Sequence, residues 1–450
     1  MHSLRNTVIS ISICTACILA SDDFELPEEI ESAAPVLFAP IETESVAEES
    51  SGTKSDRLKS VKESDARREL PAGDSTHGPG IISRKIPAEL SRPVRVGIFT
   101  DVNELYTRQG EKECRITATK GTLKIQCGTD KAVTASEKRI PQTGACTNVS
   151  NLKKTLSTSC FPGEILVRAK GNQLSAINTV DIEDYLKGVI PYEIGKLDAE
   201  RFSALESQAI AARTYAYKHF GSRESLGFDI FADTKDQVYK GLAGATALTD
   251  SAVKKTRGIV MTYEGEFIVA YYHSTCGGVT ETMETWGKES LPYLKSKSDL
   301  QEDGTPWCNE SSYFSWERIF EDKELNELIK KNATELKTKI KNFNKIESIS
   351  ILDTLKSGRI LTLEVQTDKG LFQVKGDKVR WLFKKAKTIL PSSFFRIGHD
   401  NGKWIIRGKG FGHGVGMCQM GVRARAKAGE SFEKILRHYY PGITLERFEK

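Results

Sequence analysis

An apolar stripe at helical spacing is the feature that most constrains the fold. Its members are Phe202, Leu205, Ala209, Ala212 and Ala216. This period predicts one amphipathic helix that buries a single face. Asp198 is suited to cap the start of the helix, because an aspartate oxygen can accept the free N–H groups of a first helical turn. We therefore expect a central helix over residues 198–220.

A glutamate stands just before this helix. The Ile190–Pro191 step disfavours helical backbone, so we expect residues 192–195 to form a connection that carries Glu193. A carboxylate on an ordered loop is a candidate acid or base, although glutamates on loops are more often simply solvated.

The N-terminal 92 residues differ from the remainder in composition. Residues 1–20 combine Arg5 with an apolar core and small residues, a pattern that predicts a secretory signal and export to the periplasm or cell envelope. Cys17 leaves open attachment to the membrane through a lipid. Residues 21–50 are acidic and lack Lys and Arg, and polar sequence continues to residue 92. We expect a disordered linker over residues 21–92.

The excess positive charge therefore lies in the later part of the chain. The 450 residues carry a net charge of +5 although the linker is acidic. A basic surface suits nucleic acid, anionic wall polymers or phospholipid head groups. Since the signal predicts export, we expect no nucleic acid among the partners.

Short alternating runs predict a small β-rich module over residues 93–170. Cys114, Cys127, Cys146 and Cys160 fall within it, and export permits disulfides. Four cysteines allow three connectivities. We favour the sequential one, Cys114 with Cys127 and Cys146 with Cys160.

Two further segments complete the predicted fold. Residues 316–345 are highly charged and predict a pair of solvated helices, and residues 346–374 predict short strands that turn at Ser357–Gly358 and Lys369–Gly370. Before them, Glu264–Gly265 predicts the turn of a β-hairpin. The expected fold class is α+β, with mixed helices and antiparallel β segments.

Two polar segments are candidates for ligand binding. The run YYHSTCGGVTE follows a predicted strand and contains His273, Ser274, Thr280 and Glu281. It suits a hydroxyl-rich ligand rather than Ser–His catalysis, because adjacent residues on a strand point to opposite faces. The run GKGFGHGVGMCQMG contains His413 and Gln419. It lacks the Gly-Lys-Ser/Thr ending of a phosphate loop, so we do not expect a nucleotide.

Three segments together resemble the stage II sporulation protein D family. They are PYEI…ALESQAIAARTYAY, YYHSTCGGVTE and GKGFGHGVGMCQMGVRARAKAGESFEKILRHYYPGI, in this order along the chain. The resemblance covers about residues 175–447. It implies a catalytic domain over residues 171–447 in which the helices and strands form a substrate groove.

The resemblance also implies an activity. It implies a lytic transglycosylase that cleaves the bond between N-acetylmuramic acid and N-acetylglucosamine in peptide-stripped peptidoglycan strands and leaves 1,6-anhydro ends. Glu193 becomes the acid/base residue, and one carboxyl suffices because a hydroxyl of the sugar, rather than water, attacks. The residues then expected to bind substrate are Arg213, Gln237, Tyr239, His273, Ser274, Thr280, Glu281, His413 and Gln419.

The same resemblance favours a disulfide between Cys276 and Cys308. A structural zinc site near His273, Cys276 and Cys308, with Cys418 or His413 added, is the alternative. Otherwise no cofactor is expected. The implied partners are peptidoglycan glycan strands and an N-acetylmuramoyl-L-alanine amidase. Two alternatives stay open, an amidase enhancer that does not cut the wall and a structural wall-binding protein.

Overall fold

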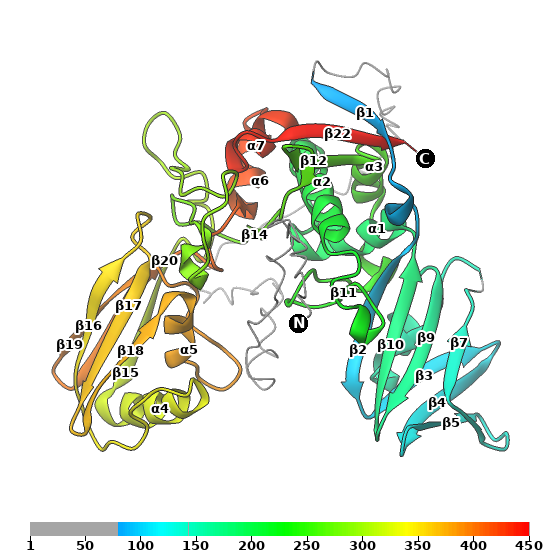
Figure 1. Cartoon of the computed structure of the whole chain (residues 1–450), viewed down its shortest axis with the longest axis horizontal. Helices are drawn as coiled ribbons and strands as arrows, with labels where there is room; N and C mark the ends of the chain where they lie inside the picture. Colours follow the sequence, from blue (N-terminus) through cyan, green and yellow to red (C-terminus); the bar gives the residue numbers. More distant parts are fainter. Residues whose placement is uncertain (1–79, 143, 450) are drawn as a thin grey trace, which may run out of the picture. The chain divides into compact units, whose positions relative to one another are not determined.

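The computed structural model describes residues 80–142 and 144–449 (Figure 1). The predicted signal over residues 1–20 and most of the predicted linker lie outside the described residues. Between residues 80 and 449, no described helix is long and apolar enough to cross a bilayer. The fold is mixed α+β, as predicted, and most of its strand pairs are antiparallel.

Two five-stranded sheets form the β-rich region, in the orders β6-β5-β4-β3-β8 and β11-β2-β10-β9-β7. The strands are β2 (Val94–Val102), β3 (Glu104–Gln109), β4 (Lys112–Thr119), β5 (Thr122–Cys127), β6 (Val133–Ala135), β7 (Glu137–Ile140), β8 (Val149–Ser150), β9 (Glu164–Lys170), β10 (Gln173–Val180) and β11 (Ile230–Phe231). Because β10 and β11 pair with β2, the predicted boundary at residue 170 falls inside a sheet. The strands of residues 93–170 therefore do not form a module by themselves.

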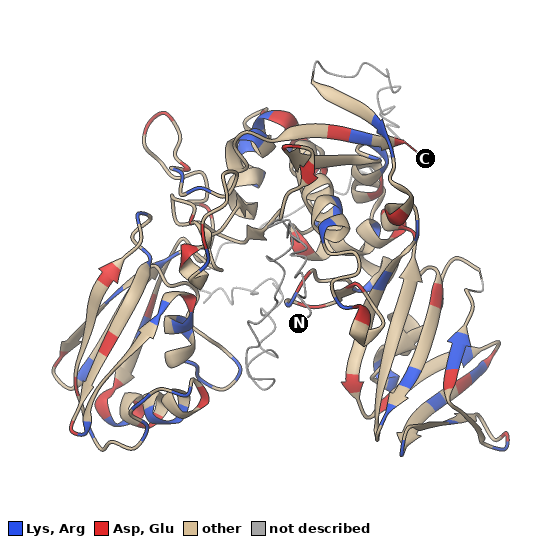
Figure 2. Ribbon diagram, in the orientation of Figure 1, with Lys and Arg blue, Asp and Glu red and all other residues tan. Residues whose placement is uncertain are grey.

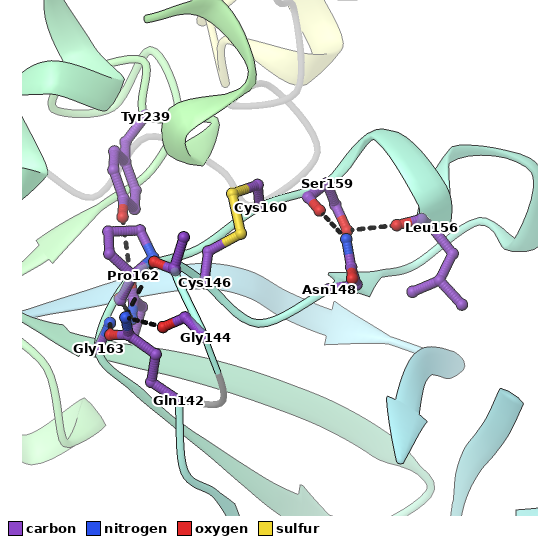
Figure 3. The surroundings of a disulfide bond; sticks show 12 residues. Gln142, Gly144, Cys146, Asn148, Leu156, Ser159, Cys160, Pro162, Gly163 and Tyr239 are labelled. Atoms are coloured by element: carbon purple, nitrogen blue, oxygen red, sulfur yellow. Dashed lines mark hydrogen bonds between the residues drawn. A yellow bond between two sulfur atoms is a disulfide. The ribbon is translucent and has the colours of Figure 1, made fainter. Parts of the chain in front are cut away.

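Both favoured disulfides of this region are confirmed. Cys114–Cys127 joins the neighbouring strands β4 and β5, and Cys146–Cys160 closes the segment between β7 and β9 (Figure 3). The Cys160 carbonyl accepts a hydrogen bond of 2.7 Å from the backbone N–H of Leu242. A Cβ at Gly241 would lie only 2.2 Å from the same carbonyl oxygen, so this close approach requires glycine. The second disulfide thus supports the chain that follows Tyr239.

The predicted central helix is confirmed. Asp198 caps a 3-10 turn over Ala199–Arg201, which leads directly into α2 (Phe202–Lys218). Leu205, Ala209, Ala212 and Ala216 of the apolar stripe are buried and Phe202 is half-buried. The expectation of one buried face is wrong, because residues 207–217 are all buried, and α1 (Ile182–Glu193) and α3 (Ala247–Lys255) are among the elements that pack against α2.

The predicted loop around Glu193 is wrong, because α1 continues through Pro191 and ends at Glu193. Proline removes one helical N–H and crowds the preceding turn, a cost that the burial of Ile190 and Pro191 offsets here. The Ile194 N–H still bonds the Ile190 carbonyl at 3.1 Å. Gly195, with φ of +85°, then ends the helix. Glu193 is therefore held on a helix end rather than on a loop.

A four-stranded sheet, β1-β22-β12-β13, brings the two ends of the described chain together (Figure 1). Its strands are β1 (Ile81–Lys85), β12 (Ile259–Tyr263), β13 (Glu266–Phe267) and β22 (Thr444–Glu449). Since β1 pairs in parallel with β22, residues 81–85 are not part of a linker. The predicted hairpin is confirmed, with Tyr263 opposite Glu266 across the Glu264–Gly265 turn.

A second hydrophobic core lies within residues 316–406. Two three-stranded sheets enclose it, β15-β20-β19 and β16-β17-β18. The elements are β15 (Ser315–Glu321), α4 (Asp322–Glu335), β16 (Ile346–Thr354), β17 (Ile360–Thr367), β18 (Gly370–Lys375), α5 (Val379–Leu382), β19 (Phe395–Asp400) and β20 (Lys403–Lys409). The strands predicted over residues 346–374 are confirmed.

The predicted helix pair over residues 316–345 is wrong. A strand, β15, comes first, and a single helix, α4, follows it. This helix buries Leu325, Ile329 and Ala333 at helical spacing, so only its other side is solvated. Figure 2 shows acidic and basic residues interspersed over the sheets and helices rather than gathered in one block. High charge therefore did not prevent this segment from building a core.

The last helices follow the glycine-rich segment. They are α6 (Gln419–Lys427) and α7 (Phe432–Tyr439), the latter capped by Ser431 as its sequence indicates. Just before α6, β21 (Met417–Cys418) pairs in parallel with β14 (Tyr272–His273). This short pairing places His273 opposite Cys418 and so joins the two polar segments of the sequence.

Candidate active site

A cavity of about 940 Å³ opens at the end of α1. Aromatic rings make much of its wall, from Tyr192, Tyr215, Tyr271, Tyr272, Trp286, Tyr313 and Phe411. Five residues that the sequence assigned to the site also line it, namely Glu193, His273, Ser274, His413 and Gln419. Flat apolar rings beside a few polar groups suit a ligand that has both apolar faces and hydroxyls.

The Glu193 carboxyl group receives hydrogen bonds from three other parts of the chain. The backbone N–H of Val238 donates to Oε1 at 2.6 Å, and Gln419 Nε2 lies 3.5 Å from Oε2. The Tyr272 hydroxyl also bonds this carboxyl group. Residues from three distant segments therefore fix the orientation of Glu193.

Burial raises the pKa of Glu193 to about 7, and the bonds from Val238, Gln419 and Tyr272 only partly oppose this rise. The position at the C-terminal end of α1 acts in the same direction as burial, since that end of a helix disfavours negative charge. Near neutral pH a large share of Glu193 is thus protonated and able to donate a proton.

The other carboxylates of the cavity wall are differently placed. Asp236 is held by Arg223 at 2.9 Å, by the Tyr215 hydroxyl and by the N–H of Phe231. Asp233 lies at the exposed rim and accepts the backbone N–H of Lys235. Both aspartates are thus engaged by other groups, and the case for a proton donor rests on Glu193, whose pKa burial raises to about 7.

Two histidines of the wall stay neutral, because burial lowers the pKa of His413 to about 4 and that of His273 well below its usual value. His413 Nδ1 accepts the N–H of Val415, and His273 Nδ1 lies 3.2 Å from the Val415 carbonyl. His273 must therefore carry its proton on Nδ1. Its Nε2 is a buried acceptor with no partner among the described residues, so a ligand hydroxyl can reach it only if the cavity wall shifts.

Arg213 does not line the cavity, contrary to expectation. Its side chain is fully buried and pairs with Glu183 through two bonds of 2.7 and 3.0 Å. It also donates to the carbonyls of Ile259 and Val253. Arg213 thus joins α1, α3 and β12 and contacts neither Glu193 nor the cavity.

Gln237 and Tyr239 lie behind the wall rather than on it. Gln237 donates to the Tyr272 hydroxyl at 3.1 Å, and Tyr272 in turn bonds Glu193. Tyr239 is buried and donates to Asn178 at 2.7 Å. Gln237 can therefore act on the site only by positioning Tyr272.

Thr280 and Glu281 are also displaced from the predicted site. The Thr280 hydroxyl donates to the Lys295 carbonyl at 2.9 Å. Glu281 accepts hydrogen bonds from the Ser357 hydroxyl and from the N–H of Thr282. Both side chains are buried, so they stabilise the loop after β14 instead of meeting a ligand in the cavity.

The predicted disulfide between Cys276 and Cys308 is not formed. Both residues are free thiols with their sulfur atoms 3.5 Å apart, and Cys418 is a third free thiol beside them. Cys418, which the sequence indicated as a candidate neighbour of the pair, is brought there by β21. Neither His273 nor His413 belongs to the sulfur cluster, so the predicted mixed zinc site also changes its composition.

Sequence reasoning missed several residues of the site. Tyr272 and the Val238 N–H contact Glu193, and Gln208 accepts a weak bond of 3.4 Å from Gln419. The only local sequence signal for any of these residues was the Tyr271–Tyr272 pair directly before His273, which could have indicated Tyr272 as a site residue. The other wall residues, such as Trp286 and Tyr313, come from segments without a recognisable pattern.

The fold and the site together define an α+β protein in which a glutamate of raised pKa lines an aromatic cavity. Comparison with known sequences shows which proteins this chain resembles. A family model described as "Stage II sporulation protein" matches residues 170–263, and a second, described as a domain of unknown function, matches residues 301–416. The second match coincides closely with the second hydrophobic core.

Relatives along most of the described chain agree with the first match. An uncharacterized protein of Brachyspira hyodysenteriae is 30% identical over 66% of this chain and 75% of its own length. Stage II sporulation protein D of Bacillus subtilis is 29% identical, covering 65% of this chain and 81% of its own length. The Bacillus subtilis protein named amidase enhancer is 31% identical over 58% of this chain, but only 40% of its own length is covered. The chain belongs to the stage II sporulation protein D family.

Proposed function

We propose that the protein is a lytic transglycosylase that cleaves peptide-stripped peptidoglycan strands between N-acetylmuramic acid and N-acetylglucosamine. The observation that carries this proposal is the state of Glu193. A carboxyl group whose pKa is raised to about 7 by burial stands in a cavity of about 940 Å³. The aromatic wall supplies stacking faces for sugar rings.

A single carboxyl group is enough for this reaction. Protonated Glu193 donates its proton to the glycosidic oxygen as the bond to C1 of the muramyl sugar breaks. The resulting carboxylate then takes the proton of the C6 hydroxyl, whose oxygen bonds C1 and forms the 1,6-anhydro ring. The proton returns to Glu193 and no water is consumed, so a second carboxylate is not required.

The neutral wall residues have defined parts in this scheme. His273 Nε2 can accept a sugar hydroxyl once the cavity wall has shifted to expose it, and Gln419 keeps the Glu193 carboxyl group oriented. The Tyr272 hydroxyl and the Val238 N–H stabilise the carboxylate after it has given up its proton.

The second candidate function is that of an amidase enhancer, which binds peptidoglycan or an N-acetylmuramoyl-L-alanine amidase and does not cut the strand. The 31% identical relative named amidase enhancer favours it. Such a role needs the cavity to bind without needing Glu193 to exchange a proton.

Digestion of purified, peptide-stripped glycan strands in ¹⁸O-labelled water distinguishes these functions. We expect products that end in 1,6-anhydromuramic acid and contain no ¹⁸O, as measured by mass spectrometry. Products that have gained ¹⁸O would indicate hydrolysis instead. If the strands stay intact and an added amidase releases peptides faster, the transglycosylase proposal is wrong and the enhancer function is supported.

The pH dependence of cleavage should follow Glu193. Because the starting state requires a protonated carboxyl group, the rate should fall by about tenfold per pH unit above a pH of about 7. Glu206 is a matched control, since burial also raises its pKa to about 7 although it does not line the cavity. In Glu206→Gln the fall should stay at the same pH. A fall that moved with Glu206 would contradict the assignment.

A further inference from the structure

Three buried thiols form a cluster next to the cavity. Cys276, Cys308 and Cys418 come from separate segments, and their sulfur atoms all lie within 4.8 Å of one another. The closest pair is Cys276 and Cys308, at 3.5 Å. The proposed reaction makes no use of these residues.

The spacing of the sulfur atoms fits ligands of one metal ion. Zn–S bonds of about 2.3 Å at tetrahedral angles place sulfur atoms about 3.8 Å from one another. The Cys276–Cys308 separation of 3.5 Å lies close to this value, and all three sulfur atoms lie within 4.8 Å of one another. A disulfide requires a much shorter separation and can join only two of the three sulfurs.

The backbone around the cluster is arranged to stabilise negatively charged sulfur. The N–H of Gly278 points to the Cys276 sulfur at 3.3 Å, the N–H of Cys276 to the Cys418 sulfur at 3.2 Å, and the N–H of Gly421 to the Cys418 sulfur at 3.4 Å. Donors of this kind surround thiolate ligands and tune them. Gly278 has φ of +100°, a conformation that side chains rarely allow.

A buried carboxylate lies beside the sulfurs. Asp299 Oδ2 is 3.3 Å from the Cys276 sulfur, and Arg425 and Tyr439 hold the same carboxylate in place. The buried guanidinium of Arg359 donates to the Cys276 carbonyl at 2.7 Å. Thiolates and a carboxylate so close together in an interior are costly unless cations balance them. The arginines provide part of that balance, and a divalent ion would provide the remainder.

We propose that Cys276, Cys308 and Cys418 bind one Zn²⁺ ion through their three sulfur atoms. Binding forms three Zn–S bonds, and each thiol that becomes a ligand releases its proton to water. The ion would join the loop after β14 to the start of α6. Cys276 follows Ser274 closely, and Cys418 directly precedes Gln419, so the ion would hold two residues of the cavity wall.

Cobalt titration of the full chain tests this proposal directly. The protein is purified, reduced, freed of metal with a chelator and titrated with Co²⁺ under exclusion of oxygen. We expect sulfur-to-cobalt charge-transfer absorption and the visible bands of tetrahedral cobalt, saturating at one ion per chain and lost when Zn²⁺ is added. Zinc should also protect the three thiols from alkylation, as mapped by mass spectrometry.

Two variants locate the site. Cys308→Ser should lose the charge-transfer absorption, whereas the double variant Cys114→Ser/Cys127→Ser removes a disulfide elsewhere and should keep it. If Cys308→Ser does not fold, alkylation of the wild type still decides whether zinc covers the three sulfurs. The proposal is overturned if the reduced, folded wild type shows no tetrahedral thiolate spectrum. It is also overturned if zinc leaves all three thiols equally reactive.

Discussion

Glu193→Gln is expected to lower cleavage of peptide-stripped strands by about 10²–10⁴-fold, the usual contribution of a positioned acid and base. The amide has nearly the shape of the carboxyl group and can still meet the Val238 N–H through its oxygen. It cannot donate a proton to the glycosidic oxygen or remove one from the sugar hydroxyl. Binding of strands should therefore change much less than cleavage.

Stability provides the check that this variant is folded. The pKa of Glu193 is raised to about 7 by burial, whereas a glutamate in an unfolded chain has a pKa of about 4.3. Between these values the folded state binds the extra proton, so the free energy of unfolding falls as pH rises through about 7. A neutral amide avoids this loss. Glu193→Gln should consequently melt no lower than the wild type at pH 8.

Glu206→Gln is the matched control for both measurements. It removes another carboxyl group with a pKa raised to about 7, but one that is half-buried and outside the cavity wall. Its cleavage rate should stay near that of the wild type. Equal cleavage by wild type and Glu193→Gln, with both folded, would rule out Glu193 as the acid/base residue. Amidase stimulation retained by Glu193→Gln would then favour the enhancer.

Arg213→Ala is expected to lower the free energy of unfolding by about 3–5 kcal/mol, the cost of removing one partner from a buried ion pair. The change leaves the Glu183 carboxylate in the interior with the N–H of Gly258, at 3.3 Å, as its remaining hydrogen-bond donor among the described residues. It also removes the bonds to the Ile259 and Val253 carbonyls. Urea unfolding followed by circular dichroism measures this loss.

Arg423→Ala separates stability from ligand binding. Arg423 belongs to α6 and lines the cavity, so its removal should weaken strand binding and change stability far less than Arg213→Ala does. The double variant Glu183→Gln/Arg213→Met should recover part of the stability, because it no longer buries an unpaired charge. If the Arg213→Ala protein had normal stability but failed to bind strands, Arg213 would have to be assigned to ligand binding after all.

Local patterns predicted the parts of the fold that depend on neighbouring residues. The stripe from Phe202 to Ala216 predicted α2, and Asp198 predicted the cap that precedes it. The sequence also predicted the Glu264–Gly265 hairpin and favoured the sequential disulfides. In each case the partners are a turn or a short loop apart, so spacing and side-chain chemistry restrict the outcome.

Burial overruled local preference in other places. Ile190–Pro191 argued for a loop, yet α1 continues to Glu193, because both residues are buried and their packing offsets the cost of the proline. The charged segment after residue 316 forms a strand and a core helix because this arrangement buries the apolar side chains of Leu325 and Ile329. Weak local signals lose to the burial of apolar side chains.

The chemistry of the cavity depends on pairings between residues that are far apart along the chain. The sequence identified Glu193, the two polar segments and the family motifs as candidates for the site. It could not reveal that β14 and β21 pair, and this pairing brings His273, Cys418 and Gln419 together. It also could not show that Glu183 would take Arg213 away from the site. The pKa of Glu193 has the same origin, because the burial that raises it exists only once these distant segments have packed.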